Sequence, residues 1–298
     1  MESVKRGGPS GAQHSGSRQL IIDAHQHFWR IARGDYTWLT PANAGLYRDF
    51  LPTDLTPELV RNDVQSTVLI QAAASEEETE SLIDLAQVHP FIAGVVGWVD
   101  FESPDVGSRM VALVAKSGGT LKGFRPMIQD ISEPNWLLLP QIDAAFESMI
   151  DSDLVFDALV GPSQLEALRL RLVRYPKLCA VLDHAGKPDI ANGEFNAWAK
   201  DLTSLARDTG AYCKLSGLLT QAGAHPSEVA IAPYIEHIFD SFGPSRVIWG
   251  SDWPVVTTSG SYSQWLALSR SLVERYATGC EREVFGATAK RAYRLEDA

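Results

Sequence analysis

Two histidines separated by a single residue, His25 and His27, follow a short apolar stretch near the start of the chain. Side chains two residues apart on a β-strand point to the same face, so both imidazoles are expected to project together from the end of a strand. Imidazoles that converge in this way can bind a metal ion or polarise a carbonyl group. Residues 246–252 form another apolar stretch, which ends in Asp252, and a closed barrel would place it beside the first. The pattern therefore predicts a site that joins two histidines and a carboxylate.

Short apolar stretches recur along the chain, and longer amphipathic stretches lie between them. Alternating strands and helices imply a parallel sheet, and eight such units in about 250 residues match the size of a (β/α)8 TIM barrel. We therefore predict an α/β protein with this barrel as a single domain. An open doubly wound sheet is the alternative, but no glycine-rich dinucleotide loop follows the first stretch. The expected strands are Leu20–Ala24, Ser66–Gln71, Ile92–Trp98, Leu121–Arg125, Leu154–Asp157, Leu178–His184, Ala211–Ser216 and Arg246–Asp252.

Two of the intervening stretches carry patterns typical of a helix start. Thr56-Pro57-Glu58 has the form of an N-cap followed by proline at the first helical position. Ser75-Glu76-Glu77-Glu78 matches a capping box, with its acids at the positive end of the helix. The stretch before the first of these helices, residues 28–53, is long for a loop. Loops of this length are often lids or binding walls.

The composition restricts the possible partners. The 298 residues include 26 Lys and Arg against 37 Asp and Glu, a net charge of -11, which argues against nucleic acid or an anionic membrane as a general partner. No apolar run approaches the roughly 18 residues that a membrane span needs. The cysteines Cys179, Cys213 and Cys280 lie far apart, as expected for thiols in a reducing compartment. We predict a cytoplasmic protein that acts on a small molecule, and a homo-oligomer is compatible with these features.

Residues 1–18 are rich in glycine, serine and charge and contain no apolar anchor. This composition is typical of a disordered tail. The barrel domain is then expected to cover residues 19–298.

Polar residues stand at the ends of most of the expected strands. In TIM barrels the active site lies at the carboxyl ends of the strands, so His25, His27, His184 and Asp252 together favour a catalytic site. For Asp157, Lys214 and Ser216 a structural role is as much expected as a functional one. Further polar or aromatic candidates at these ends and in the first loop are Gln71, Trp98, Asp100, Arg125, Trp38 and Arg48.

Several of these strand ends belong to recognisable motifs: Asp23–Trp29, Arg48–Phe50, Gly94–Asp100, Gly123–Arg125, Asp183–Pro188, Lys214–Leu218 and Gly250–Pro254. On these motifs the chain resembles the amidohydrolase superfamily. Within it, the chain resembles the lactonase group that includes L-fuconolactonase, L-rhamnonolactonase and 2-pyrone-4,6-dicarboxylate lactonase. The resemblance runs from residue 20 to about residue 293. It implies a (β/α)8 barrel and hydrolysis of a sugar-acid lactone, as in carbohydrate catabolism.

The metal pattern of the superfamily is incomplete in this chain. A binuclear member would carry a carboxylated lysine after the fourth strand and histidines after the fifth and sixth. Here the fourth expected strand ends in Arg125, and no histidine follows the fifth. Because a lactone is an activated ester, we expect that no cofactor is required. One divalent metal such as zinc, held by His25, His27 and Asp252, is the alternative.

Asp252 is the expected general base, because it is the acid at the end of the last strand, beside the histidines. His25, His27, His184 and Arg125 would polarise the lactone carbonyl and stabilise the oxyanion. The expected substrate-binding residues are Arg125, Arg48, Trp38 and Lys214.

Three alternative functions follow from the same residues. A dicarboxylate lactone from aromatic degradation could be the substrate, because Arg48, Arg125, Lys187 and Lys214 could bind carboxylates. A zinc-dependent decarboxylase of the same superfamily would be distinguished by metal analysis, and a non-catalytic binding barrel by an inert substitution at Asp252. The aromatic first loop and the acidic chain favour a neutral sugar lactone such as L-fuconolactone or L-rhamnonolactone, although the sequence does not determine the sugar.

Overall fold

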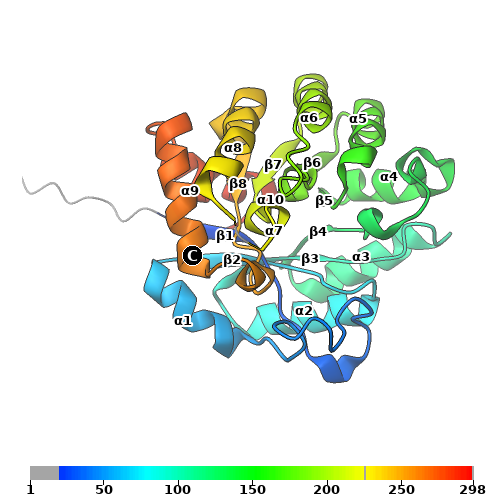
Figure 1. The fold of residues 1–298 in the computed structure, drawn as a ribbon. Coiled ribbons are helices and arrows are strands. Elements are labelled where there is room, and N and C mark those ends of the chain that lie inside the picture. The colour runs from blue at the N-terminus through cyan, green and yellow to red at the C-terminus, as the bar shows by residue number, and fades with distance from the viewer. Residues whose placement is uncertain (1–19, 225, 297–298) are drawn as a thin grey trace, which may run out of the picture.

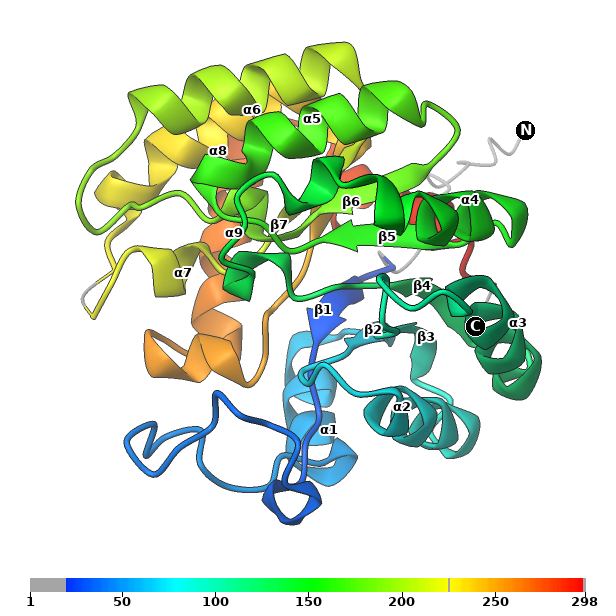
Figure 2. The ribbon, with the colours of Figure 1, turned by 90° about the vertical axis from the view of Figure 1, so that its right-hand side faces the viewer.

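The computed structural model describes residues 20–224 and 226–296, so the expected tail lies outside the described residues. Eight parallel strands form one sheet in chain order, which curves into a barrel with helices around it (Figures 1 and 2). This confirms the predicted (β/α)8 class. The strands are β1 (Ile22–Gln26), β2 (Ser66–Ile70), β3 (Ile92–Gly97), β4 (Leu121–Phe124), β5 (Val155–Ala158), β6 (Cys179–Leu182), β7 (Tyr212–Leu215) and β8 (Val247–Trp249).

The helices form the outer layer of the barrel, and most follow one strand and precede the next (Figure 1). Within the described residues, no helix is both long enough and apolar enough to cross a membrane. The helices are α1 (Pro52–Asn62), α2 (Glu76–Val88), α3 (Val106–Ser117), α4 (Asp143–Asp151), α5 (Leu165–Arg174), α6 (Asn196–Asp208), α7 (Leu218–Gln221), α8 (Glu228–Phe242), α9 (Tyr262–Tyr276) and α10 (Thr288–Tyr293).

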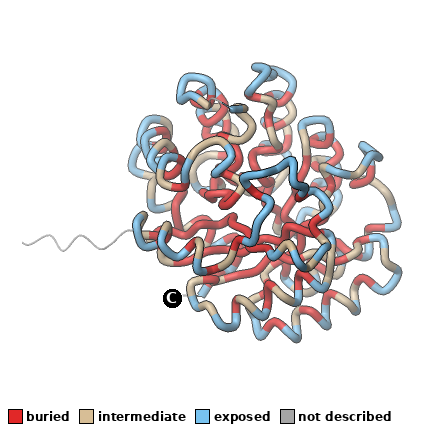
Figure 3. The backbone as a smooth tube through the Cα atoms, turned by 60° about the horizontal axis from the view of Figure 1, so that its bottom comes forward, coloured by how far each residue is buried: buried red, intermediate tan, exposed pale blue. Residues whose placement is uncertain are grey.

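The strands are buried on both faces, which explains why they are nearly continuous apolar runs in the sequence. Figure 3 shows buried backbone concentrated in the barrel and on the helix faces turned toward it. One large hydrophobic cluster fills the space between strands and helices. A smaller cluster lies inside the barrel and includes residues of α10, which packs against the interior. Its buried members are Ile22, Ala24, Val68, Ile70, Val96, Val155, Val181, Ile248, Ala289, Ala292, Tyr293 and Leu295.

The barrel closes where the end of β1 meets the residues that follow β8. The amide of Asp252 donates to the His25 carbonyl (2.8 Å), and the amide of His27 donates to the Trp253 carbonyl (2.8 Å). Gly250 makes this approach possible, because a Cβ there would lie 2.7 Å from the Cβ of His25. Closure therefore brings the first and the last predicted site residues together.

Candidate active site

The four residues expected to form the site converge at the carboxyl ends of the strands. His25 Nε2 lies 3.2 Å from His27 Nε2, and Asp252 Oδ1 lies 3.4 Å from His27 Nε2 and 3.7 Å from His25 Nε2. His184, directly after β6, brings its Nε2 to 4.0 Å from Asp252 Oδ1. All four side chains are buried or nearly so. The structure thus places residues from three distant parts of the chain at one point.

Unusual backbone conformations aim two of these side chains. His184 has φ 50° and Asp252 has φ 59°, both in the left-handed region that non-glycine residues rarely occupy. The ring of His184 packs on Gly217, where a Cβ would lie 2.7 Å from His184 Nδ1. Its Nδ1 shares a hydrogen bond with the Ser216 hydroxyl (2.9 Å), so Nε2 is left to face Asp252. Strained residues that the surroundings hold in place are common at functional sites.

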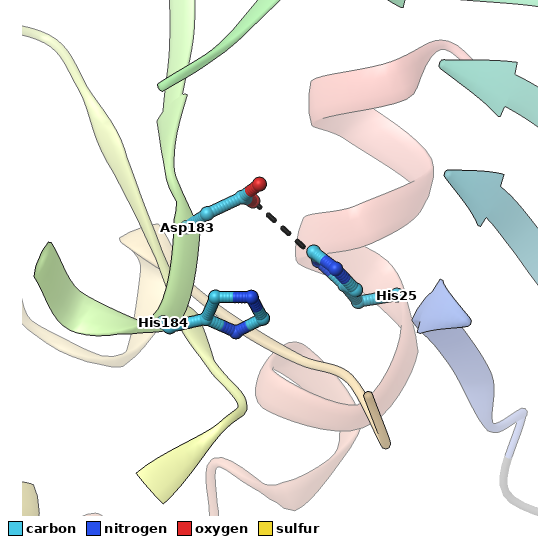
Figure 4. Close-up of side chains that lie close together, drawn as sticks. All are labelled: His25, Asp183 and His184. Atoms are coloured by element: carbon cyan, nitrogen blue, oxygen red, sulfur yellow. Dashed lines mark ion pairs between the residues drawn. The ribbon is translucent and has the colours of Figure 1, made fainter. Parts of the chain in front are cut away.

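A buried layer of charges supports the histidines from below. Lys214 Nζ lies 2.5 Å from Asp157 Oδ2 and 2.9 Å from Asp183 Oδ1, and it is 3.2 Å from His25 Nδ1. The Tyr293 hydroxyl donates to Asp157 (2.9 Å). Asp183 also forms an ion pair with His25 Nδ1 at 3.5 Å if the imidazole is protonated, and Figure 4 shows these two side chains beside His184. The pair of Lys214 and Asp183 therefore lies directly beneath the His25 imidazole.

Arg125 occupies a fixed position at the wall of the site. Its Nη1 donates to Asp183 Oδ2 (3.1 Å), and its Nη2 donates to the carbonyl and to the side-chain oxygen of Gln71. Gln71 in turn donates its Nε2 to the Arg125 carbonyl (2.8 Å). Arg125 as a whole is only 3% exposed, so its positive charge is held at the site without freedom to move away.

The charge state of the site follows from burial and from these neighbours. Burial opposes ionisation of Asp252, but His184 and a hydrogen bond from His27 hold the pKa of Asp252 well below its usual value. Burial, with the positive charge of Lys214 added, lowers the pKa of His25 well below its usual value. Burial also lowers the pKa of His184 to about 4. At neutral pH, Asp252 is therefore a carboxylate that can accept a proton, and His25 and His184 are neutral.

Hydrogen bonds decide which ring nitrogens carry protons. His27 Nδ1 lies 2.9 Å from the Ile70 carbonyl, which can only accept, so Nδ1 carries a proton. Arg125 Nη1 can only donate, and it lies 3.2 Å from His25 Nε2, which therefore accepts. His25 Nε2 thus presents a lone pair toward His27 Nε2 and the Asp252 carboxylate. These groups favour a further positive charge among them, which a metal ion would supply.

The donor set of His25, His27 and Asp252 fits one divalent metal. Their ligand atoms lie within 4.8 Å of one another, and the measured separations of 3.2–3.7 Å are close to the edge of a zinc tetrahedron, about 3.3 Å. A metal on His25 Nε2 would compete with the hydrogen bond from Arg125. The lysine of β4, Lys122, extends away from the site to the Arg294 carbonyl (3.4 Å), so the described β4 supplies no lysine for a binuclear centre.

A cavity of about 230 Å³ opens above these groups. Pockets for drug-sized ligands usually measure roughly 300–1,000 Å³, so this cavity suits a smaller molecule. Both apolar and polar side chains form its walls, as a sugar-like ligand would need. It is lined by His27, Trp38, Ala72, Arg125, Met127, Gln129, Asp130, Leu159, His184, Lys187, Gly217, Thr220, Gln221, Asp252 and Val255.

The expected substrate-binding residues are divided between two environments. Arg125 and Trp38 line the cavity, whereas Lys214 is buried beneath it. Arg48 lies outside the lining; its guanidinium stacks on the Phe50 ring at 3.8 Å and is 3.5 Å from Asp54.

Sequence reasoning missed several lining residues, namely Met127, Gln129, Asp130, Leu159, Thr220, Gln221 and Val255. They follow the strands in loops, helix α7 and short helical turns, and their position in these connections was the one available signal. Lys187, considered only as a carboxylate ligand, also lines the cavity and donates to Gln129 Oε1 (2.5 Å).

Comparisons with known proteins agree with this geometry. A family described as "Amidohydrolase" matches residues 22–295. An L-fucono-1,5-lactonase of Burkholderia ambifaria is 42% identical over 279 residues, covering 92% of this chain and 96% of the relative. An L-fucono-1,5-lactonase of Burkholderia multivorans is 36% identical, covering 93% and 97%.

Solved structures show the same relationship. A crystal structure of an amidohydrolase from Burkholderia multivorans with bound zinc is 33% identical with a TM-score of 0.88, covering 93% of this chain and 100% of that one. A probable 2-pyrone-4,6-dicarboxylic acid hydrolase from Acinetobacter baumannii is 18% identical with a TM-score of 0.75, covering 92% and 99%. That similarity shows the fold alone.

Proposed function

Because this chain belongs to the amidohydrolase family, we propose that it opens the lactone ring of a sugar acid by hydrolysis. The observation that carries the proposal is the ionised, buried Asp252 at a cavity of monosaccharide size, beside Arg125 and the histidines. The two relatives named L-fucono-1,5-lactonase support a sugar-acid 1,5-lactone as substrate.

Each step of the reaction can be assigned to residues of the cavity. Asp252 removes a proton from water as the water oxygen attacks the lactone carbonyl carbon. The charge that develops on the carbonyl oxygen is stabilised by the positive charge of Arg125 at the cavity wall. A positioned base of this kind contributes roughly 10²- to 10⁴-fold to the rate, and a preorganised donor about 3 kcal/mol. When the bond to the ring oxygen breaks, Asp252 returns the proton to that oxygen, and the product is an open hydroxy acid.

The same residues that carry out the proposed steps also fit one divalent metal. A divalent ion held by His25, His27 and Asp252 would act as a Lewis acid on the lactone carbonyl. The positive charge of Arg125 lies at the wall of the same cavity, and a lactone is already activated toward attack. We therefore propose that turnover does not depend on the ion.

The walls of the cavity select the substrate. The indole of Trp38 offers an aromatic surface for the apolar face of a sugar ring, while Gln129, Lys187 and Gln221 offer hydrogen bonds to its hydroxyls. Free thiols at Cys179, Cys213 and Cys280 support the proposal that the protein works in the reducing cytoplasm.

The test is a panel of aldonolactones that differ at single hydroxyl or methyl groups, with a dicarboxylate lactone for comparison, assayed by proton release. Asp252→Asn serves as the control, because it keeps the size of the side chain but cannot accept the proton. We expect rapid hydrolysis of at least one sugar lactone by the wild type and a roughly 10²- to 10⁴-fold lower kcat in the variant. Equal rates for the two proteins on every lactone would contradict the proposal.

A further inference from the structure

The wall of the cavity at Trp38 belongs to the long loop between β1 and α1, whose two ends are joined at Trp29 and Phe50. The amide of each of these two residues donates to the carbonyl of the other (3.0 Å). The indole of Trp29 also packs edge-on against the indole of Trp38, with ring centroids 5.4 Å apart. Trp38 Nε1 donates to the Ala72 carbonyl (2.8 Å). The position of the indole in the cavity therefore depends on the turn that follows β2.

That turn is held from the opposite side by a buried acid of helix α2, Glu78. The amide of Ala72 donates to both carboxylate oxygens (3.1 and 3.0 Å), and the amide of Ala73 donates to Oε2 (2.8 Å). The phenol of Tyr36, two residues before Trp38, lies near this carboxylate, and burial together with the Glu78 charge raises the pKa of Tyr36. Glu78 thus joins the turn after β2 to the segment of the loop that carries Trp38.

Glu78 is a buried acid without a paired cation among the described residues, so its hydrogen bonds must offset the cost of burying it. Its side chain is fully buried, and no carboxylate–cation pair within 4.0 Å involves it in residues 20–224 and 226–296. The charge of Glu78 acts on Arg33 in the same loop, but the ion-pair partner of Arg33 is Asp35, at 2.6 Å. Burying a carboxylate without a paired cation is costly unless hydrogen bonds compensate, and here the compensating donors are the amides of Ala72 and Ala73 in the turn.

We propose that Glu78 is a positioning residue of the lactone pocket, which sets the place of the Trp38 indole against the sugar. Glu78 is not among the residues that line the cavity, so it acts through Ala72, Tyr36 and Trp38. This inference rests on the proposed lactonase function. Because an aromatic wall contacts the sugar in the ground state and in the transition state alike, its displacement should raise KM and leave kcat nearly unchanged.

The test begins with Glu78→Gln and its matched control, Glu77→Gln, an exposed acid one residue earlier on the same helix. Glutamine keeps one acceptor oxygen and replaces the other by an NH2 donor, which would face the Ala72 amide where Oε1 now accepts from it at 3.1 Å. The hold on the turn is therefore weakened. We expect KM for the preferred sugar lactone to rise about tenfold, as one lost charge-assisted hydrogen bond would cause. We expect kcat to stay within about twofold and Glu77→Gln to match the wild type. A lower kcat with unchanged KM would overturn the proposal.

A cycle with Trp38→Ala tests whether the effect passes through the indole. If it does, Glu78→Gln adds nothing to KM once Trp38 is absent; additive effects would contradict the proposed route. Tyr36→Phe removes only the hydroxyl and should raise KM in the same direction, which provides a second test if Glu78→Gln folds poorly. No increase in KM for Tyr36→Phe would then count against the proposal.

A readout without substrate separates this inference from the proposed function. Acrylamide quenching of tryptophan emission, with Trp38→Phe as the reference, reports how exposed the Trp38 indole is. We expect Glu78→Gln to increase quenching of the Trp38 component, and unchanged quenching would refute the positioning role. If no lactone is hydrolysed, the proposed function fails, while the quenching experiment still decides whether Glu78 positions Trp38.

Discussion

Replacing Lys214 by methionine should destabilise the protein through the two carboxylates that the lysine neutralises. The Nζ atom lies 2.5 Å from Asp157 and 2.9 Å from Asp183, and all three side chains are fully buried. Breaking a buried pair by removing one partner usually costs about 3–5 kcal/mol, because the other charge remains buried without compensation.

The structure places the expected loss at the lower end of that range. Asp183 keeps Arg125 at 3.1 Å, and Asp157 keeps the Tyr293 hydroxyl. Burial already raises the pKa of Asp157 to about 6, against the effect of Lys214. Without the lysine this pKa rises further, so Asp157 can take up a proton at modest cost. We therefore expect a loss of about 3 kcal/mol near neutral pH.

The stability loss in Lys214→Met should depend on pH, because the substitution changes the pKa of Asp157. A carboxyl group whose pKa is higher in the folded than in the unfolded protein contributes stability at low pH, and that contribution disappears as the pH rises through the folded pKa. Lys214→Met should therefore be closer to the wild type at pH 5.5 than at pH 8. The double variant Lys214→Met/Asp157→Asn, which has no isolated charge at Asp157, should recover most of the loss at pH 8.

Thermal unfolding followed by circular dichroism, at one heating rate for all variants, measures these differences. Asp157→Asn alone completes the cycle and gives the coupling between the two residues. A Lys214→Met variant as stable as the wild type at pH 8 would refute the reasoning. So would a double variant that is less stable than Lys214→Met, because the carboxylate would then not be the source of the loss.

Three further predictions concern the site and its supports. Arg125→Ala should lower kcat/KM by roughly 10²- to 10³-fold, the usual effect of removing a preorganised electrostatic group. Arg48 lies outside the cavity lining, so Arg48→Ala should change kcat/KM little. Steady-state kinetics of both variants distinguish the two roles. Removal of metal with EDTA should leave most of the turnover, and complete loss that added zinc restores would assign polarisation of the carbonyl to the ion. Burial raises the pKa of Glu78 from 4.5 to about 7. Folding therefore favours the protonated acid, and a contribution of about 3 kcal/mol to the free energy of unfolding is present at low pH and lost as the pH rises to about 7. The thermal midpoint of Glu78→Gln should therefore rise relative to the wild type between pH 5 and pH 8, and a constant difference would show that Glu78 does not titrate in this range.

The strands were predictable because each is a buried apolar run, but helix starts show where sequence patterns mislead. Ser75 caps α2 as expected, accepting from the amide of Glu78 (3.1 Å). The acid of the expected capping box, however, bonds to the amides of Ala72 and Ala73 instead. The prediction of a helix start at Thr56 was wrong, since α1 begins at Pro52. The Thr56 hydroxyl donates to the Pro52 carbonyl (2.8 Å), a bond that threonine makes within helices as readily as it caps them.

The site was predictable only as far as strand ends determine it. His25 lies near the end of β1, and His27, His184 and Asp252 come after strands, and these strand ends meet in any such barrel. Depth within the barrel is not visible in a sequence, so Lys214, a residue inside β7, was expected beside the substrate although it lies beneath the histidines. The cavity walls contributed by loops, such as Gln129 and Gln221, depend on chain paths that no local pattern encodes.

The place of Tyr293 has a consequence for how the protein is made. Its hydroxyl donates a hydrogen bond to Asp157, although the two residues are 136 positions apart in the chain. During synthesis on the ribosome all eight strands emerge before α10, so a nascent barrel first carries Asp157 and Lys214 without their tyrosine. Chains that stop before residue 293 would keep an open interior and an incomplete charge layer. Quality-control proteases that recognise loosely packed chains could therefore distinguish unfinished copies from finished ones.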